Sequence, residues 1–183
     1  MMTKDHNPIR KAMLVSGLAL LFACCANRQQ LANDPPTVVR HVDLDRYLGK
    51  WYEIARYPNR FQKACVASTA VYSSREDGRI HVLNACRKGS LEGPLKQAEG
   101  KAWVVDETTQ AKLKVQFFWP FRGDYWIIDL GEDYEYAVVG HPKRKYLWIL
   151  SRTPQMETEV YEAILERIIR NGYDPDRLIR TEH

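Results

Sequence analysis

Lys112-Leu113-Lys114-Val115-Gln116-Phe117 alternates between polar and apolar side chains at every step. Successive side chains of a β-strand point to opposite faces of a sheet. Leu113, Val115 and Phe117 therefore share one face of this stretch, and the polar residues share the other. The pattern predicts a strand that is buried on one side only.

Similar short apolar or alternating runs lie on both sides of this stretch, and turn residues separate them. A regular series of this kind is typical of an all-β sandwich or barrel. Asp77-Gly78 is a strong hairpin signal between two of the runs. Eight strands are predicted, over residues 51–56, 66–74, 79–87, 97–105, 111–118, 124–130, 135–140 and 146–151.

One helix is predicted after the strands. Thr153 is a suitable N-cap, and Pro154 suits the first helical position. Gly172 supplies a left-handed stop. Apolar residues recur at helical spacing between these points, which favours packing of one helix face on the outside of the sheet; they are Val160, Ile164, Leu165, Ile168 and Ile169. Residues 178–181 form one further short strand candidate.

The first 23 residues have the pattern of a secretory signal. A polar start carries Lys4, Arg10 and Lys11, and an uncharged, mostly apolar run covers residues 12–23. This run is shorter than the roughly 20 residues that a membrane-spanning helix needs. The alternative is a buried N-terminal helix, which would show an apolar stripe instead of a continuous block.

Leu21-Phe22-Ala23-Cys24 resembles the lipobox of bacterial lipoproteins, although Phe22 is larger than the residue which that family prefers. The resemblance implies cleavage before Cys24, a lipid on Cys24 and a membrane anchor. Residues 24–41, with Pro35-Pro36, are then the lipidated N-terminus and tether, and residues 42–183 the domain. Cys25 in place of an aspartate favours the outer membrane over the inner membrane of a bacterial envelope, with the domain facing the periplasm.

Charge and composition exclude several classes of protein. Residues 1–23 carry a net +2 of the chain's +4, so removing them from the 183 residues leaves 160 residues with a net +2. That charge gives no basis for nucleic-acid binding. The five histidines are scattered and form no metal-spaced cluster with the cysteines, and neither a metal nor a cofactor is expected.

Cys65 and Cys86 lie at the outer ends of the predicted hairpin around Asp77. A turn there places Cys86 opposite Ala67 or Ser68, so a β-bulge could bring the two cysteines together. Export to an oxidising compartment makes a disulfide between them a hypothesis.

Three short motifs resemble the ordered signatures of the lipocalin family. They are Gly49-Lys50-Trp51 at the first strand, Asp133-Tyr134-Glu135-Tyr136 before the seventh, and Arg152 after the eighth. The resemblance covers residues 42–181 and is greatest to the bacterial outer-membrane branch of the family. It implies an all-β fold, an eight-stranded antiparallel up-and-down barrel with one C-terminal helix outside. Gly49, Trp51 and Arg152 are then structural, with Arg152 lying across the Trp51 ring at the closed end.

Parity within the strands predicts which side chains line the cavity of such a barrel. If Arg152 points inward, so do Trp148 and Tyr146. The full set of predicted lining residues is Ala70, Tyr72, Val82, Asn84, Leu113, Val115, Phe117, Tyr125, Ile127, Tyr146 and Trp148. Large aromatic residues can fill a core as readily as they line a pocket. The alternative is therefore that about half of these side chains only pack the core.

The resemblance implies a lipid-binding protein whose ligand is a fatty acid or a lysophospholipid. Arg56, Arg60 and Lys63 follow the first strand and could meet a headgroup, or could be solvated loop charges. Two alternatives remain open, an enzyme acting on a bound lipid and a structural lipoprotein with a filled barrel. No Gly-x-Ser-x-Gly or His-Glu-x-x-His motif favours an enzyme, although Glu53 and Asp129 could point inward. The sequence leaves open whether two copies form a homodimer.

Overall fold

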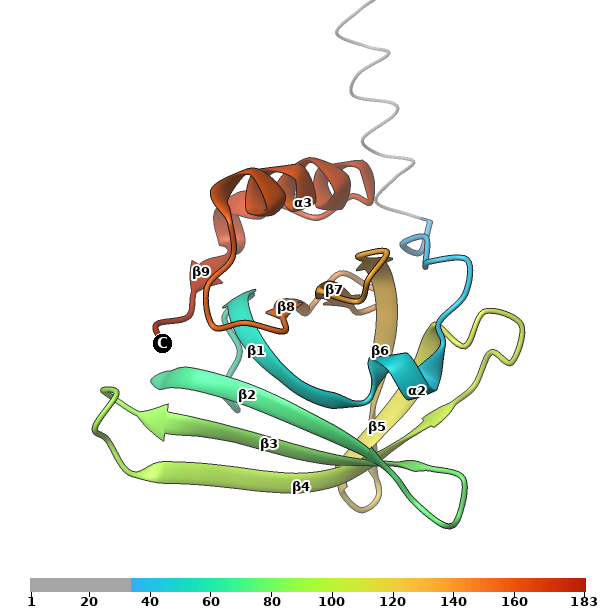
Figure 1. Ribbon diagram of the computed structural model, residues 1–183, viewed down its shortest axis with the longest axis horizontal. Coiled ribbons are helices and arrows are strands. Elements are labelled where there is room, and N and C mark those ends of the chain that lie inside the picture. Colours follow the sequence, from blue (N-terminus) through green and yellow to red (C-terminus); the bar gives the residue numbers. More distant parts are fainter. Residues whose placement is uncertain (1–33) are drawn as a thin grey trace, which may run out of the picture. The chain divides into compact units, whose positions relative to one another are not determined.

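The computed structural model describes residues 34–183, of which residues 36–183 form one compact unit. Strands β1 to β8 follow one another in an up-and-down antiparallel order, and β1 closes the barrel by pairing with both β2 and β8 (Figure 1). The predicted eight-stranded barrel is confirmed. The strands are β1 (Gly49–Arg56), β2 (Cys65–Ser74), β3 (Ile80–Lys88), β4 (Leu95–Val104), β5 (Lys112–Phe118), β6 (Phe121–Leu130), β7 (Tyr136–Gly140) and β8 (Leu147–Ser151).

Alternate connections meet at the same end of an up-and-down barrel. The short helix α2 (Leu44–Tyr47) lies at the closed end, with the β2–β3, β4–β5 and β6–β7 connections. The other four connections form what we call the open rim, residues 57–64, 89–94, 119–120 and 141–146. The predicted last strand is present as β9 (Ile179–Arg180), which pairs with β1 after a single 3-10 turn, η1 (Pro175–Arg177).

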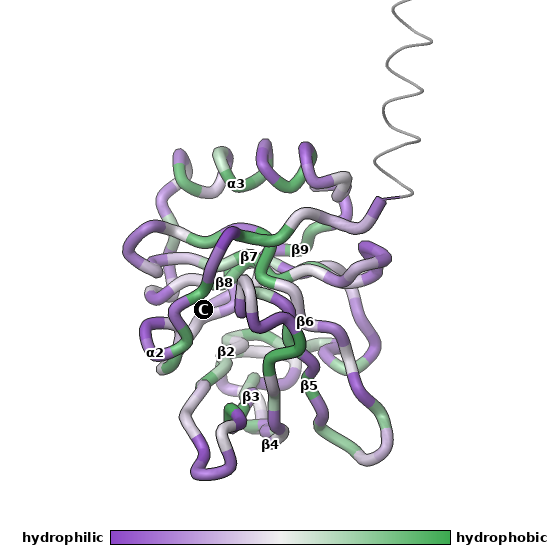
Figure 2. The backbone as a smooth tube through the Cα atoms, turned by 90° about the vertical axis from the view of Figure 1, so that its right-hand side faces the viewer, coloured by the Kyte–Doolittle hydropathy of each residue, from purple (hydrophilic) through white to green (hydrophobic). Residues whose placement is uncertain are grey.

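Two hydrophobic clusters hold the unit together. One fills the barrel interior, and the other lies between the outer face of the sheet and α3 (Thr158–Arg170). Figure 1 shows α3 lying across β7 and β8, and Figure 2 shows hydrophobic and hydrophilic segments alternating along it. Ile164 and Ile168 are fully buried in the outer cluster, as the helical spacing predicts. Every described member of both clusters lies at or after Val38, within the compact unit of residues 36–183.

The helix begins later than the sequence predicts. Its N-cap is Glu157, and the prediction of a start at Thr153 and Pro154 is wrong. The Thr153 hydroxyl donates to the Gln155 carbonyl at 2.6 Å, and the Thr153 N–H donates to the Ser151 hydroxyl. These local bonds hold the segment in a bend and leave no side chain to cap a helix there. The C-terminal stop is as predicted, since Gly172 has a φ of +79° directly after the Asn171 cap.

Asp129 points out of the barrel, and the expectation that it could point inward is wrong. The register between β6 and β7 shifts between Ile127 and Asp129. A bulge of this kind moves the next side chain to the other face of the sheet. Asp129 accepts a hydrogen bond of 2.6 Å from Arg167 Nε on α3, and so fastens the helix to the sheet.

Residues 36–41, which the sequence assigns to the tether, lie against the barrel. The Val39 N–H donates to the Ile127 carbonyl, and Pro36 is buried. Thr37 exchanges two hydrogen bonds with the Asn171 side chain at the end of α3. The predicted signal segment and Cys24 lie outside the described residues.

A bulge also joins the two cysteines. The β2–β3 register shifts within residues 66–69, which places Ala67 and Ser68 opposite Cys86. This brings the Cα atoms of Cys65 and Cys86 to 5.5 Å, and the two residues form a disulfide. The disulfide fastens the β2–β3 hairpin at the open end of the barrel.

Replacing both cysteines with serine is expected to lower the free energy of unfolding by about 3 kcal/mol, because the disulfide closes a loop of about 20 residues in the unfolded chain. Urea denaturation of residues 34–183 measures the change. Reduction of the unchanged protein should lower its stability by a similar amount. Two free thiols in the oxidised protein would contradict the disulfide.

Candidate functional site

The barrel interior is the candidate site, and most of the predicted lining residues lie in it. Ala70, Tyr72, Val82, Leu113 and Ile127 are buried members of the interior cluster. Val115, Phe117, Tyr125 and Trp148 are partly buried and pack against that cluster. The register places Asn84 opposite Ala70, on the same inner face, whereas Tyr146 lies at the open rim and stacks on Trp148.

The closed end is built around Trp51, which is fully buried. The Arg152 guanidinium lies 3.7 Å from the centre of its ring, an arrangement that a cation and an indole face favour. Gly49 has a φ of +94°, and a Cβ there would come within 3.3 Å of the Arg152 Nη1. Arg152 also donates to five backbone carbonyls, those of Arg46, Tyr47, Leu48, Lys50 and Tyr134. One side chain therefore joins α2 to the ends of three strands and seals this end.

Three tyrosine hydroxyls meet inside the barrel above the closed end. Tyr125 shares hydrogen bonds of 2.7 Å with Tyr47 and 2.9 Å with Tyr72. Burial raises the pKa of all three phenols, and that of Tyr72 to about 12. The group is therefore neutral at physiological pH, and its polar atoms satisfy one another inside an apolar wall.

A small cavity of about 10 Å³ lies beside the tyrosines. Its lining is apolar apart from the three hydroxyls and consists of Tyr47, Tyr72, Ile80, Val82, Ala102, Leu113, Val115 and Tyr125. Ligand pockets usually measure about 300–1,000 Å³. Because the cavity is far smaller than this, an acyl chain can enter only if interior side chains move apart and the space opens toward the open rim.

The β1–β2 loop folds inward at the open rim and limits that space. The Gln62 amide oxygen accepts 2.9 Å hydrogen bonds from Trp148 Nε1 and from the Asn59 side chain. Phe61 stacks edge-on against Tyr146 and lies 6.3 Å from the Trp148 ring. Sequence periodicity gives no signal for this loop, so Phe61 and Gln62 were not among the predicted site residues.

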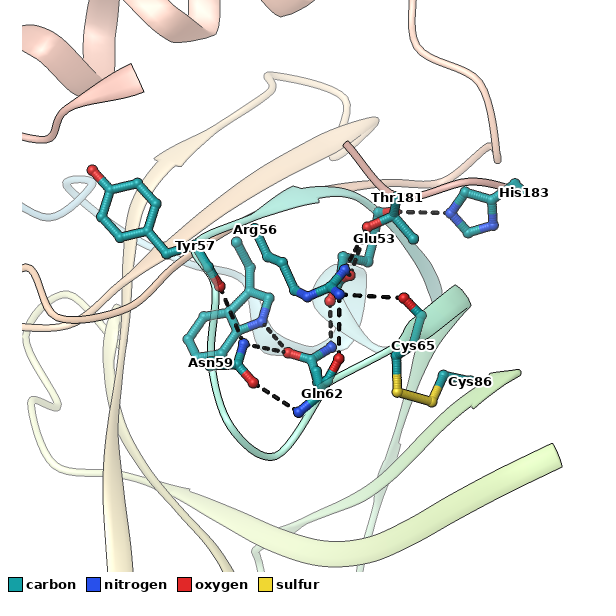
Figure 3. A network of polar contacts seen from close by, with 10 residues as sticks. Glu53, Arg56, Tyr57, Asn59, Gln62, Cys65, Cys86, Thr181 and His183 are labelled. Atoms are coloured by element: carbon teal, nitrogen blue, oxygen red, sulfur yellow. Dashed lines mark hydrogen bonds and ion pairs between the residues drawn. A yellow bond between two sulfur atoms is a disulfide. The ribbon is translucent and has the colours of Figure 1, made fainter. Parts of the chain in front are cut away.

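A buried ion pair fixes the base of the loop (Figure 3). Arg56 Nη1 donates to the Glu53 carboxylate at 2.7 Å, and each side chain is about 5 % exposed. Gln62 Nε2 and the Thr181 hydroxyl also donate to Glu53. The interpretation of Arg56 as a headgroup ligand or a solvated charge is therefore wrong, whereas Arg60 and Lys63 are exposed. Glu53 is a hydrogen-bonded structural group.

Neither a metal site nor a membrane-spanning helix is found in the part of the chain that the structure describes. Residues 34–183 hold no group of three histidine, cysteine, aspartate or glutamate side chains placed to bind a metal ion. No helix within the same range is long and apolar enough to cross a membrane.

Comparison with known proteins gives the same fold. A family profile described as a lipocalin-like domain matches residues 42–183. The chain belongs to the lipocalin family. It is 46% identical over 143 residues to the outer membrane lipoprotein Blc of Escherichia coli K12, covering 78% of this chain and 80% of that protein.

Two further relatives show how widely the family extends. Temperature-induced lipocalin-1 of Arabidopsis thaliana is 43% identical over 153 residues, which cover 79% of this chain and 81% of that protein. The solved structure of insecticyanin from Manduca sexta superposes with a TM-score of 0.65 at 20% identity, over 82% of this chain and 85% of that chain. The likeness to insecticyanin concerns the fold alone.

Membership of this family implies that the lipocalin binds a small hydrophobic ligand. Lipocalins are in general binding and transport proteins and not enzymes. The interior can therefore be interpreted as a binding site whose wall is apolar, whose closed end is sealed by Trp51 and Arg152, and whose mouth is narrowed by Gln62.

Proposed function

We propose that this lipocalin binds the single acyl chain of a fatty acid or lysophospholipid inside its barrel, without chemical change. The observation that carries the proposal is the apolar interior, in which the described residues that line the cavity present three neutral tyrosine hydroxyls and otherwise apolar side chains. Each buried methylene contributes about 0.8 kcal/mol, so ten of them give a gross gain of roughly 8 kcal/mol before the costs of association.

Entry of the acyl chain requires the β1–β2 loop to move. Gln62 and Phe61 lie at the open rim, and two of the contacts that hold them are with the Trp148 and Tyr146 side chains. Breaking these contacts extends the cavity past Trp148. The loop then lies beside the part of the ligand that reaches the open rim.

The polar end of the ligand stays at the open rim. Arg60 and Lys63 are exposed on the β1–β2 loop, where either can meet a carboxylate or a phosphate. Asn84 Oδ1 is buried on the inner face and has no hydrogen-bond partner among the described residues. A donor on the ligand, such as the glycerol hydroxyl of a lysophospholipid, would satisfy this oxygen.

The same proposal includes an anchor at the bacterial outer membrane, with the barrel facing the periplasm. It is supported by the lipobox-like segment that ends at Cys24 and by the likeness to outer membrane lipoproteins of Escherichia coli and Vibrio cholerae. Mass spectrometry of the protein from its own cells tests the anchor, since a chain that retains residues 1–23 would contradict it.

Residues 34–183 purified without detergent are expected to carry an extractable single-chain lipid and to retain a fluorescent fatty acid. Replacement of Ala102, which lines the cavity, by phenylalanine should weaken fatty-acid binding by at least about tenfold, because the ring takes space from several methylenes. Fluorescence titration measures the affinity.

The matched control is Ala85→Phe, on the opposite face of the neighbouring strand β3, which should bind normally. An empty extract together with no retained fluorescent fatty acid would favour a filled, purely structural barrel. Conversion of the bound lipid to a new product would favour the enzyme.

A further inference from the structure

Large apolar side chains are exposed around the open rim. Eight such residues are exposed among residues 34–183, and five of them, Phe61, Leu95, Phe118, Trp119 and Phe121, lie in the open rim or next to it. The most exposed of them lie in or beside the β5–β6 connection: the exposed fraction is 74% for Phe118, 85% for Trp119 and 76% for Phe121. We call residues 118–121 the aromatic tip, and it projects from the lower right of the barrel in Figure 2. Aromatic residues gathered in this way at one surface usually mark an interaction site.

The charges of the two barrel ends have opposite sign. The four connections of the open rim carry five basic residues and one acidic residue, a net charge of +4; these are Arg60, Lys63, Lys143, Arg144, Lys145 and Glu92. The connections at the closed end, residues 75–79, 105–111, 131–135 and 152–157, carry three basic and eight acidic residues, a net charge of −5. The field of this lipocalin therefore turns the open rim toward a negatively charged surface.

Aromatic tip and basic rim together have the chemistry of a membrane-interface contact. Tryptophan is enriched where lipid headgroups meet acyl chains, because its ring is apolar and its N–H is polar. Lysine and arginine beside such a residue are attracted to anionic headgroups. Arg122 follows the tip at the start of β6, and Lys96 at the start of β4 donates to the Phe61 carbonyl of the open rim, so both add to the basic residues at this end.

The chain enters the compact unit next to the same rim. Thr37 is hydrogen-bonded to Asn171, whose carbonyl accepts a 2.8 Å hydrogen bond from Arg144 of the β7–β8 connection. Thr37 lies thirteen Cα–Cα steps after Cys24, a reach of about 45 Å at full extension. A chain of this length lets the rim reach the bilayer that holds the lipid on Cys24. Among the arguments for docking, only this one depends on the proposed lipid anchor.

We propose that the open rim is a docking surface for an anionic phospholipid bilayer, with the aromatic tip inserted at the level of the headgroups. The barrel mouth then faces the membrane, so a single-chain lipid can pass between bilayer and barrel without crossing water. The docking surface goes beyond the proposed ligand binding, because it would operate with an empty barrel as well.

The test is co-sedimentation of residues 34–183, which lack Cys24 and so the proposed lipid anchor, with vesicles. We expect binding to mixed phosphatidylcholine–phosphatidylglycerol vesicles, little binding to pure phosphatidylcholine, and a decrease in binding at high salt. Replacing Phe118, Trp119 and Phe121 with serine should weaken binding by at least about tenfold. These side chains are exposed, so thermal unfolding should stay unchanged.

The control replaces Val105, an exposed apolar residue of the β4–β5 connection at the closed end, with serine, and should bind vesicles normally. Failure of the unchanged protein to bind anionic vesicles, or full binding by the aromatic-tip variant, would overturn the proposal. A dimer that forms with rising concentration in the unchanged protein and is lost in the aromatic-tip variant, without any vesicle binding, would also overturn the proposal. The aromatic tip would then be a contact between two copies of the chain. Retention of fluorescent fatty acid by the tip variant keeps the two proposals separate, since docking can fail while ligand binding stands.

Discussion

Replacing Trp51 with alanine is expected to lower the free energy of unfolding by about 3–5 kcal/mol, the usual cost of removing a fully buried tryptophan. The residue has no exposed surface, packs against the Tyr47 ring and donates from its indole to the Tyr47 carbonyl. Its loss leaves a cavity between α2 and the start of β1. Equilibrium denaturation of residues 34–183 in urea measures the change.

The contribution of Arg152 to the stability of the closed end is measured in the same way. Arg152→Ala removes the cation above the ring and the donors to five backbone carbonyls, of which the half-exposed ones can turn to water. We expect a loss of about 2–3 kcal/mol. A double-mutant cycle with Trp51→Ala should give a coupling of about 1–2 kcal/mol. Additive losses would show that the stacked pair contributes nothing beyond its separate contacts.

Arg152→Lys is the informative control, because it keeps the charge and loses the planar fork. A lysine can satisfy at most three of the carbonyls and cannot stack, so it should recover less than half of the loss. Full recovery would mean that charge alone, and not the shape of the guanidinium, seals the closed end.

Strand positions could be predicted from the sequence because the information is local. Leu113, Val115 and Phe117 alternate with polar residues, and period two fixes their common face wherever the strand lies. The same argument, started from Arg152, places Trp148 and Leu150 inside. Each strand begins one to three residues away from its predicted start, since end residues are fixed by pairing with neighbours that the sequence does not show.

The bulges in β1 and β6 and the β1–β2 loop could not be predicted, because tertiary pairing sets them. One shift beside Asp129 turns its carboxylate from the interior to Arg167 on α3. Arg56 follows another shift in β1 and is buried against Glu53 instead of reaching a ligand. The Gln62 loop has no periodic pattern, and its place in the mouth depends on partners, such as Trp148, that lie far away in the chain.

Arg56→Met is expected to destabilise the protein by about 3–5 kcal/mol, because it leaves the Glu53 carboxylate buried without its cation. The two side chains are about 5 % exposed, so water replaces Arg56 poorly. Arg56 also donates to the carbonyls of Gln62 and Cys65 at both ends of the loop's inner segment. Amide hydrogen exchange in residues 57–64 should therefore become faster, in addition to the loss seen in urea denaturation.

The double variant Glu53→Leu with Arg56→Met separates charge burial from shape. Removing both charges takes away the cost of burying them, so the double variant should be more stable than Arg56→Met alone. Its loop should still exchange quickly, because the donors to the Gln62 and Cys65 carbonyls are absent in both variants. A double variant as unstable as the single one would mean that Arg56 acts through these carbonyl contacts and not through Glu53. In that case the ion pair between Glu53 and Arg56 adds nothing to stability. The β1–β2 loop is then held at the mouth of the barrel by the hydrogen bonds from the Arg56 guanidinium to the Gln62 and Cys65 carbonyls.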